Sequence, residues 1–152
     1  ATDLTVAAHA GRLVTMDPAG TPTAITIPAI NATADSAIAG PGSDPNNPNT
    51  IGTTFEILFI DDFTGTIKTA NTADKFVGAV TVGIDASVAG KQFIPATANN
   101  EVNLNGEAGA SVATTGGLKG SRIKFTAIAA NLYAVEGQLV GSGSIATPFD
   151  SQ

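Results

Sequence analysis

The sequence predicts an all-β fold, a jelly-roll-like β-sandwich or barrel with extended terminal arms. Thr, Val, Ile and Gly dominate, and no segment keeps apolar residues at helical spacing for more than two turns. Short stretches of alternating apolar and polar residues recur instead, separated by Gly, Asn, Asp and Pro. About nine strands at this spacing are typical of sandwiches and jelly rolls.

Each expected strand is a short run rich in β-branched or aromatic residues that ends at a turn-forming residue. Alternation is clearest at 53–60, 76–83, 121–128 and 132–140. Four phenylalanines fall on the apolar phase of these strands and are expected in the core: Phe55, Phe59, Phe76 and Phe125. In order, the strands are 12–16, 23–27, 53–60, 65–69, 76–83, 92–94, 101–104, 121–128 and 132–140.

The most informative element is a hairpin in the last third of the chain. A Gly116-Gly117 turn precedes the strand at 121–128, and a break at 129–131 returns the chain as the strand at 132–140. Alternation predicts one buried face, with Ile123, Phe125, Tyr133, Val135 and Leu139. The other, wetter face carries Arg122, Lys124, Thr126, Glu136 and Gln138.

We expect a single β domain over residues 1–152. Residues 1–50 would hold an N-terminal arm, the early strands and a Pro/Asn-rich loop, and 51–140 the main body. Residues 141–152 would form a C-terminal arm, because Gly and Ser at 141–144 make a soft hinge and Pro148 keeps the chain extended. The alternative is that Phe149 folds back and packs into its own sandwich.

Composition excludes several partner classes. Only 13% of residues are charged, against about 25% in typical domains, and the net charge is −6. Nucleic acid is not expected as a partner, because phosphate binding needs clustered Lys and Arg. No apolar run is long enough to span a membrane. The chain has no Cys, so it has neither disulfides nor thiolate metal sites.

Catalytic chemistry and cofactors are not expected either. His9 is the single histidine and fits a hydrogen-bonded residue at the start of the first strand better than a member of a catalytic triad. Asp61-Asp62 resembles a hairpin tip, with divalent-metal binding as the alternative. The oxygen-rich segment 44–49 lacks the register of a calcium loop and is expected to be a surface loop. We therefore predict no metal site.

Several motifs together resemble the small capsid decoration (cement) proteins of tailed bacteriophages. The likeness rests on His9-Ala10-Gly11-Arg12 and a strand ending in Pro28, then on the Gly-Gly turn, a Leu-aromatic-x-Val-x-Gly strand at 132–137, and a terminal Ala-Thr-Pro-Phe at 146–149. Tyr133 stands where tryptophan is usual, and the insert at 41–50 is longer than expected.

This resemblance implies a structural virion protein, made in the host cytoplasm, that stabilises a capsid as homotrimers bridging major capsid subunits. The motif residues expected at contacts are His9, Arg12, Tyr133, Pro148 and Phe149. Two alternatives stay open: another virion protein such as a tail component, or a carbohydrate-binding or adhesion module. The second would use exposed aromatic rings, and the chain has one Tyr and no Trp.

Overall fold

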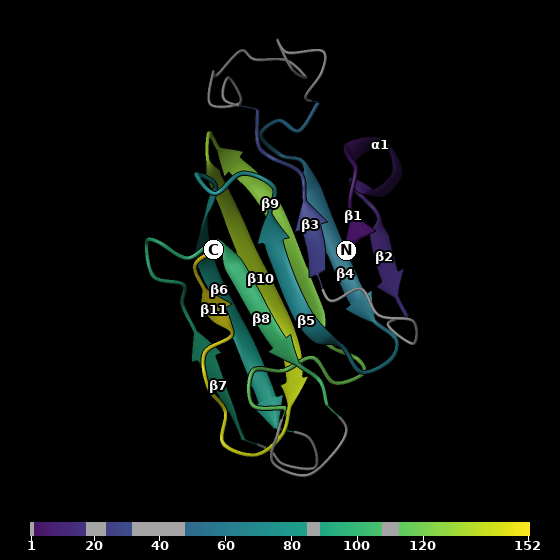
Figure 1. The fold of residues 1–152 in the computed structure, drawn as a ribbon, viewed down its shortest axis with the longest axis vertical. Helices are drawn as coiled ribbons and strands as arrows, with labels where there is room; N and C mark the ends of the chain where they lie inside the picture. Colours follow the sequence, from purple (N-terminus) through teal and green to yellow (C-terminus); the bar gives the residue numbers. More distant parts are fainter. Residues whose placement is uncertain (1, 18–23, 32–47, 85–88, 108–112) are drawn as a thin grey trace.

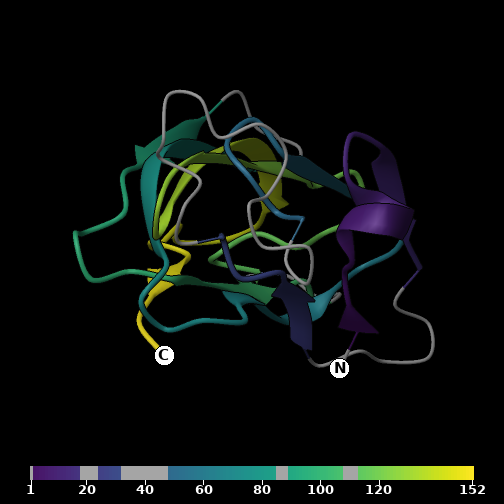
Figure 2. The same cartoon turned by 90° about the horizontal axis from the view of Figure 1, so that it is seen from above.

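The protein is a sandwich of two mixed β-sheets packed face to face (Figures 1 and 2). The computed structural model describes residues 2–17, 24–31, 48–84, 89–107 and 113–152. The sheets have five and six strands and do not join into a closed barrel, so the sandwich prediction is confirmed and the barrel alternative is wrong. Both sheets contain parallel pairs, whereas a jelly roll is antiparallel.

The five-stranded sheet has the order β1-β3-β5-β8-β11. Its first two pairings are parallel with β3 in the middle, and β5–β8 and β8–β11 are antiparallel. Its strands are β1 (Thr2–Asp3), β3 (Ala24–Ile27), β5 (Thr64–Thr69), β8 (Glu101–Asn105) and β11 (Phe149–Asp150).

The six-stranded sheet has the order β2-β4-β9-β10-β6-β7. Strands β2–β4 and β10–β6 are parallel, and the others are antiparallel. The strands are β2 (Leu13–Met16), β4 (Thr54–Phe59), β6 (Lys75–Ile84), β7 (Gly90–Phe93), β9 (Arg122–Ala129) and β10 (Leu132–Gly141). One short helix, α1 (Val6–His9), lies between β1 and β2.

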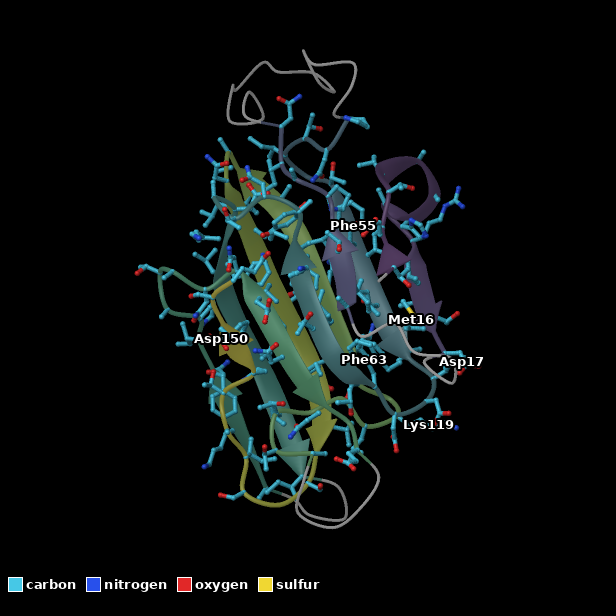
Figure 3. The ribbon with its side chains drawn as sticks, viewed as in Figure 1. Met16, Asp17, Phe55, Phe63, Lys119 and Asp150 are labelled. Atoms are coloured by element: carbon cyan, nitrogen blue, oxygen red, sulfur yellow. The ribbon has the colours of Figure 1, made fainter. Side chains whose placement is uncertain are left out.

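Aromatic rings fill the space between the sheets. Phe125 lies 5.3 Å from Phe76 and 6.5 Å from Tyr133, centroid to centroid. Phe59 on β4 stacks at 4.7 Å on Phe63, which precedes β5, so this pair joins the two sheets where the chain crosses between them. Phe55 and Phe63 lie within the outline of the sheets in Figure 3. The four phenylalanines predicted for the core are all buried.

The predicted hairpin is confirmed as β9 and β10, with the expected faces inward. Its turn is tight because Asn131 adopts φ 59°, a left-handed conformation that Asn tolerates. The register shifts between Leu132 and Tyr133, as in a bulge that follows such a turn. All nine expected strands are present, with bounds that differ by a few residues.

The predicted terminal arms are wrong in the described residues. At the C-terminus Ile145, Pro148 and Phe149 are buried, and β11 pairs with β8. The last residue, Gln152, donates its side-chain amide to the Thr69 carbonyl at 3.1 Å. The reason is an unfilled sheet edge beside β8, where the Phe149 ring finds apolar neighbours within its own chain.

The N-terminus also belongs to the sandwich. Thr2 and Asp3 pair in parallel with Ile25 and Thr26, and Leu4 is buried in the core. Both sequence ends therefore extend the same five-stranded sheet, one at each edge.

Two loop predictions need comment. Asp61-Asp62 is not the tip of a hairpin, because β4 and β5 belong to different sheets and the connection crosses between them. It does form a turn, in which Asp61 Oδ1 accepts from the Asp62 amide at 2.9 Å. Of the Pro/Asn-rich insert at 41–50, residues 41–47 lie outside the described residues, and only 48–50 are described.

The buried tail makes a stability prediction. Phe149→Ala removes a ring that is 7% exposed and is expected to lower the unfolding free energy by about 3 kcal/mol. Ile94→Ala is the control, since that side chain is 73% exposed and should change stability by less than about 0.5 kcal/mol. Urea denaturation measures the unfolding free energy of both variants. Equal, small losses would show that Phe149 belongs to a terminal arm and not to the core.

Candidate functional site

The candidate site is the outer face of the six-stranded sheet. Alternation along β4, β9, β10 and β6 sends the ring-bearing residues inward and a mixed polar and small set outward. Because these strands are in register, the outward residues form rows that cross the sheet. One row runs Thr15, Leu58, Arg122, Gln138, Thr81 and Gln92. The next runs Leu13, Glu56, Lys124, Glu136 and Ala79.

Two ion pairs lie in the middle of these rows. Arg122 Nε donates to Glu56 Oε1 at 2.7 Å, and Lys124 Nζ lies 3.1 Å from Glu136 Oε1. The hydrogen bond from Arg122 lowers the pKa of Glu56, and the same bond raises the pKa of Arg122. The four charges cancel, so these two ion pairs add no net charge to the face.

Only part of the Arg122 guanidinium is hydrogen-bonded within the described residues. Its Nε bonds Glu56, and the described residues offer no partner to its two terminal nitrogens. The Gln138 amide and the Thr81 hydroxyl, which follow Arg122 in the same row, also make no hydrogen bond within the described part of the chain. The row therefore presents a donor-rich line to solvent.

This face carries two shallow depressions that are open to solvent. A hollow of about 680 Å³ lies over Arg122, Glu136, Gly137 and neighbouring residues, and a second of about 420 Å³ lies over Gly78, Ile128 and Ala134. The two share Ala79 and Glu136, so we treat them as one trough with a polar end and an apolar end.

At Gly78, in the wall of the trough, β6 and β10 approach each other closely. The φ of Gly78 is 107°, and a Cβ there would lie 2.2 Å from the Val135 carbonyl oxygen on the paired strand. Only glycine therefore fits at this point of the β6–β10 pairing. The sequence offered a signal, because a glycine inside an alternating strand often marks close backbone approach.

Beside the core lies a buried polar clamp formed by Asn49, Asp74 and Tyr133. Asn49 Nδ2 donates to the carbonyls of Pro28 and Ala29, both at 3.1 Å, and to the Tyr133 hydroxyl at 2.6 Å. Tyr133 in turn donates to the Pro28 carbonyl at 2.7 Å. Burial, more than any other effect, raises the pKa of Tyr133. The clamp holds the segment after β3 against the hairpin.

Asp74 is the costly member of this clamp. Its Oδ2 accepts from the Ile30 amide at 3.1 Å, while its buried Oδ1 has no hydrogen-bond partner among the described residues. Burial raises the pKa of Asp74, against opposing effects from the Ile30 amide and from Lys75. Burial with one oxygen lacking a hydrogen bond destabilises the ionised form of the Asp74 side chain relative to its protonated form. Sequence analysis did not single out Asp74, because nothing in its local pattern marks burial. Asn49 was expected in the surface loop at 44–49, and its full burial shows that this prediction was wrong for Asn49.

The five predicted contact residues fall into two groups. Tyr133, Pro148 and Phe149 are buried within the chain, so in a single molecule they form no exposed surface. Arg12 is exposed and His9 is partly exposed, near one edge of the sandwich. His9 lies in α1 rather than at the start of a strand, and its Nδ1 accepts from the Thr5 amide at 2.9 Å.

The described residues contain no group of three or more His, Cys, Asp or Glu side chains placed to hold a metal ion. Within the same residues, no helix is long and apolar enough to cross a membrane. Asp62 Oδ1 accepts from the Lys119 amide at 2.8 Å, which ties two loops together.

Comparison of the chain with protein-family models, with curated proteins and with solved structures gave no match.

The Gly78 contact gives a direct prediction. Gly78→Ala is expected to lower the unfolding free energy by about 2–3 kcal/mol, because a left-handed φ and a clash with Val135 both oppose the new methyl group. Gly52→Ala is the matched control, with φ 89° but open space around it, and should cost less. Thermal denaturation compares them, and equal losses would show that the β6–β10 contact is not the constraint.

Asp74 gives a pH prediction. Because its folded pKa lies above its unfolded value, its contribution to stability is largest below the unfolded pKa and is lost as pH rises through the folded pKa. The melting temperature of the natural protein minus that of Asp74→Asn should therefore fall between about pH 4 and pH 7. A difference that is flat across this range would contradict burial of an ionisable carboxyl group.

Proposed function

We propose that the protein is a structural virion component that decorates and stabilises a bacteriophage capsid, as homotrimers that bridge major capsid subunits. One observation supports this proposal. Every aromatic ring of the chain points into the sandwich, and the first and last strands, β1 and β11, form the two edges of the five-stranded sheet. The result is a compact body whose described surface is low in charge and carries several exposed aliphatic side chains. Such a body suits a role in which the protein is a mechanical link.

The motifs behind the family resemblance agree with a scaffold role. Ile123, Tyr133, Val135 and Phe149 are all buried, and they belong to the hairpin and to the closing strand. The resemblance therefore lies in framework residues, which specify how the sandwich closes. Contact residues of such a protein are free to differ from one particle to another.

The carbohydrate-binding alternative is less well supported. Sugar rings are bound by stacking on exposed aromatic side chains, and the chain has seven Phe, one Tyr and no Trp. All of them are buried except Phe93, which is partly buried against the core. No ring is left to form a stacking platform.

Two measurements test the proposal. In light scattering, the purified protein should have a mass three times that of the 15.1 kDa chain. Quantitative mass spectrometry of purified particles of the encoding phage should find it in the head fraction, in a fixed ratio to the major capsid protein. Its absence from particles, or its presence only in isolated tails, would overturn the capsid assignment.

Capsid stabilisation has its own readout. Particles that lack the protein should release DNA at a lower temperature than complete particles, and adding back the purified protein should restore the difference. Unchanged DNA release in its absence would contradict a stabilising role.

A further inference from the structure

We propose that the trough on the outer face of β4, β9, β10 and β6 is a docking site for an extended polypeptide segment of another protein. The segment would place an apolar side chain at the Gly78–Ala134 end and a carboxylate on Arg122. The inference rests on the proposed function only for the identity of that partner, which would be a capsid subunit.

The apolar end gathers much of the exposed apolar surface of the chain. Val77 and Ile128, 39% and 40% exposed, flank Ala134, which pairs with Val77 across the strands. The Gly52 amide donates to the Ala127 carbonyl, so the turn that carries the exposed Ile51 lies at the same end. Apolar side chains grouped beside a hollow indicate an interaction surface.

The polar end supplies a guanidinium edge that can bind a carboxylate. The terminal nitrogens of Arg122 face solvent with no partner among the described residues, and Gln138 and Thr81 extend the donor line beside them. Arginine binds a carboxylate through two parallel hydrogen bonds. The Glu56 carboxylate already holds the guanidinium by its Nε, which fixes its plane and leaves the outer edge available.

The distance between the apolar and polar ends of the trough sets the spacing of the two side chains that the bound segment needs. Ala134 and Gln138 are four residues apart on β10, about 13 Å along an extended strand. A segment lying along β10 would thus need its apolar and acidic side chains at positions i and i+4. Protein interfaces combine this kind of apolar centre with an arginine at the rim.

A polypeptide is favoured over a glycan because the trough offers no aromatic ring. The outward residues of β4, β9, β10 and β6 are aliphatic, small, hydroxyl-bearing, amide or charged. A second copy of this chain is a further possible occupant, and the test below separates all three.

The probe is a blocked heptapeptide of Thr and Ser that carries Leu and, four residues later, Asp. Three comparison ligands are the same peptide in reverse order, a version with Lys in place of Asp, and the neutral sugar maltohexaose. Amide chemical shifts of the isotope-labelled full chain report binding. We expect an Asp peptide, in one order or the other, to shift amides along β6, β9 and β10, and the Lys peptide to bind at least about tenfold more weakly.

Two variants locate the site. Ala134→Arg fills the apolar hollow and should abolish the shifts. Arg122→Ala should weaken binding of the Asp peptide about tenfold and should not weaken binding of the Lys peptide, because it removes a positive charge and releases the Glu56 carboxylate. Thr66→Arg, on the outer face of β5 in the other sheet, is the control and should bind normally. The dispersion of each spectrum shows whether the variant is folded.

The inference is overturned by any of several results. Amide shifts could be absent at millimolar peptide, the Asp and Lys peptides could bind equally well, or only maltohexaose could cause shifts. Loss of the trimer in Ala134→Arg would also overturn it, because a second copy of the chain would then be the occupant of the trough. If Ala134→Arg still binds particles normally, the proposed capsid role stands and only the docking face is wrong.

Discussion

The parallel pairing of β10 with β6 is the constraint on which the rest of the structure depends. It joins Leu132–Gly141 to Lys75–Ile84 over ten consecutive residues, with Gly78 admitting the Val135 carbonyl at the closest point. Its inner side carries Phe76 and Tyr133, which meet Phe125 of the neighbouring strand. Its outer side carries the trough. Core and candidate docking surface are thus two faces of one strand pair, and a change that spreads it would alter both.

The buried polar clamp shows what this arrangement costs. Tyr133 belongs to the core through its ring and to the clamp through its hydroxyl, which bonds Asn49 and Pro28. Asp74, just before β6, binds the Ile30 amide but leaves one oxygen unsatisfied. Hydrogen bonds of this kind specify one position for the chain after β3, and the desolvated carboxyl of Asp74 offsets part of that gain.

Local pattern was enough to predict nine of the strands and their buried faces, because alternation in β4, β9 and β10 is strict. The two-residue strands β1 and β11 were not predicted, because a segment that short shows no alternation. Local pattern was not enough to predict which strands pair. Asp61-Asp62 resembled a hairpin tip, yet the chain crosses between sheets there, and that choice depends on long-range packing of Phe59 on Phe63. The prediction of a C-terminal arm was wrong for the same reason. Gly, Ser and Pro at 141–148 suggest an arm, and only the free sheet edge beside β8 makes Phe149 a core residue. Of the site, alternation placed Arg122 and Lys124 outward, but the trough requires the β10–β6 register, which no local signal gives.

For the proposed capsid role, cryo-electron microscopy of phage particles that carry the protein tests the central claim most directly. The account predicts closed trimers on the capsid shell, with the outer face of β4, β9, β10 and β6 covered by an extended segment of a neighbouring capsid subunit and a carboxylate on Arg122. A map in which this face is open to solvent, or in which the chain lies in the tail, would contradict it.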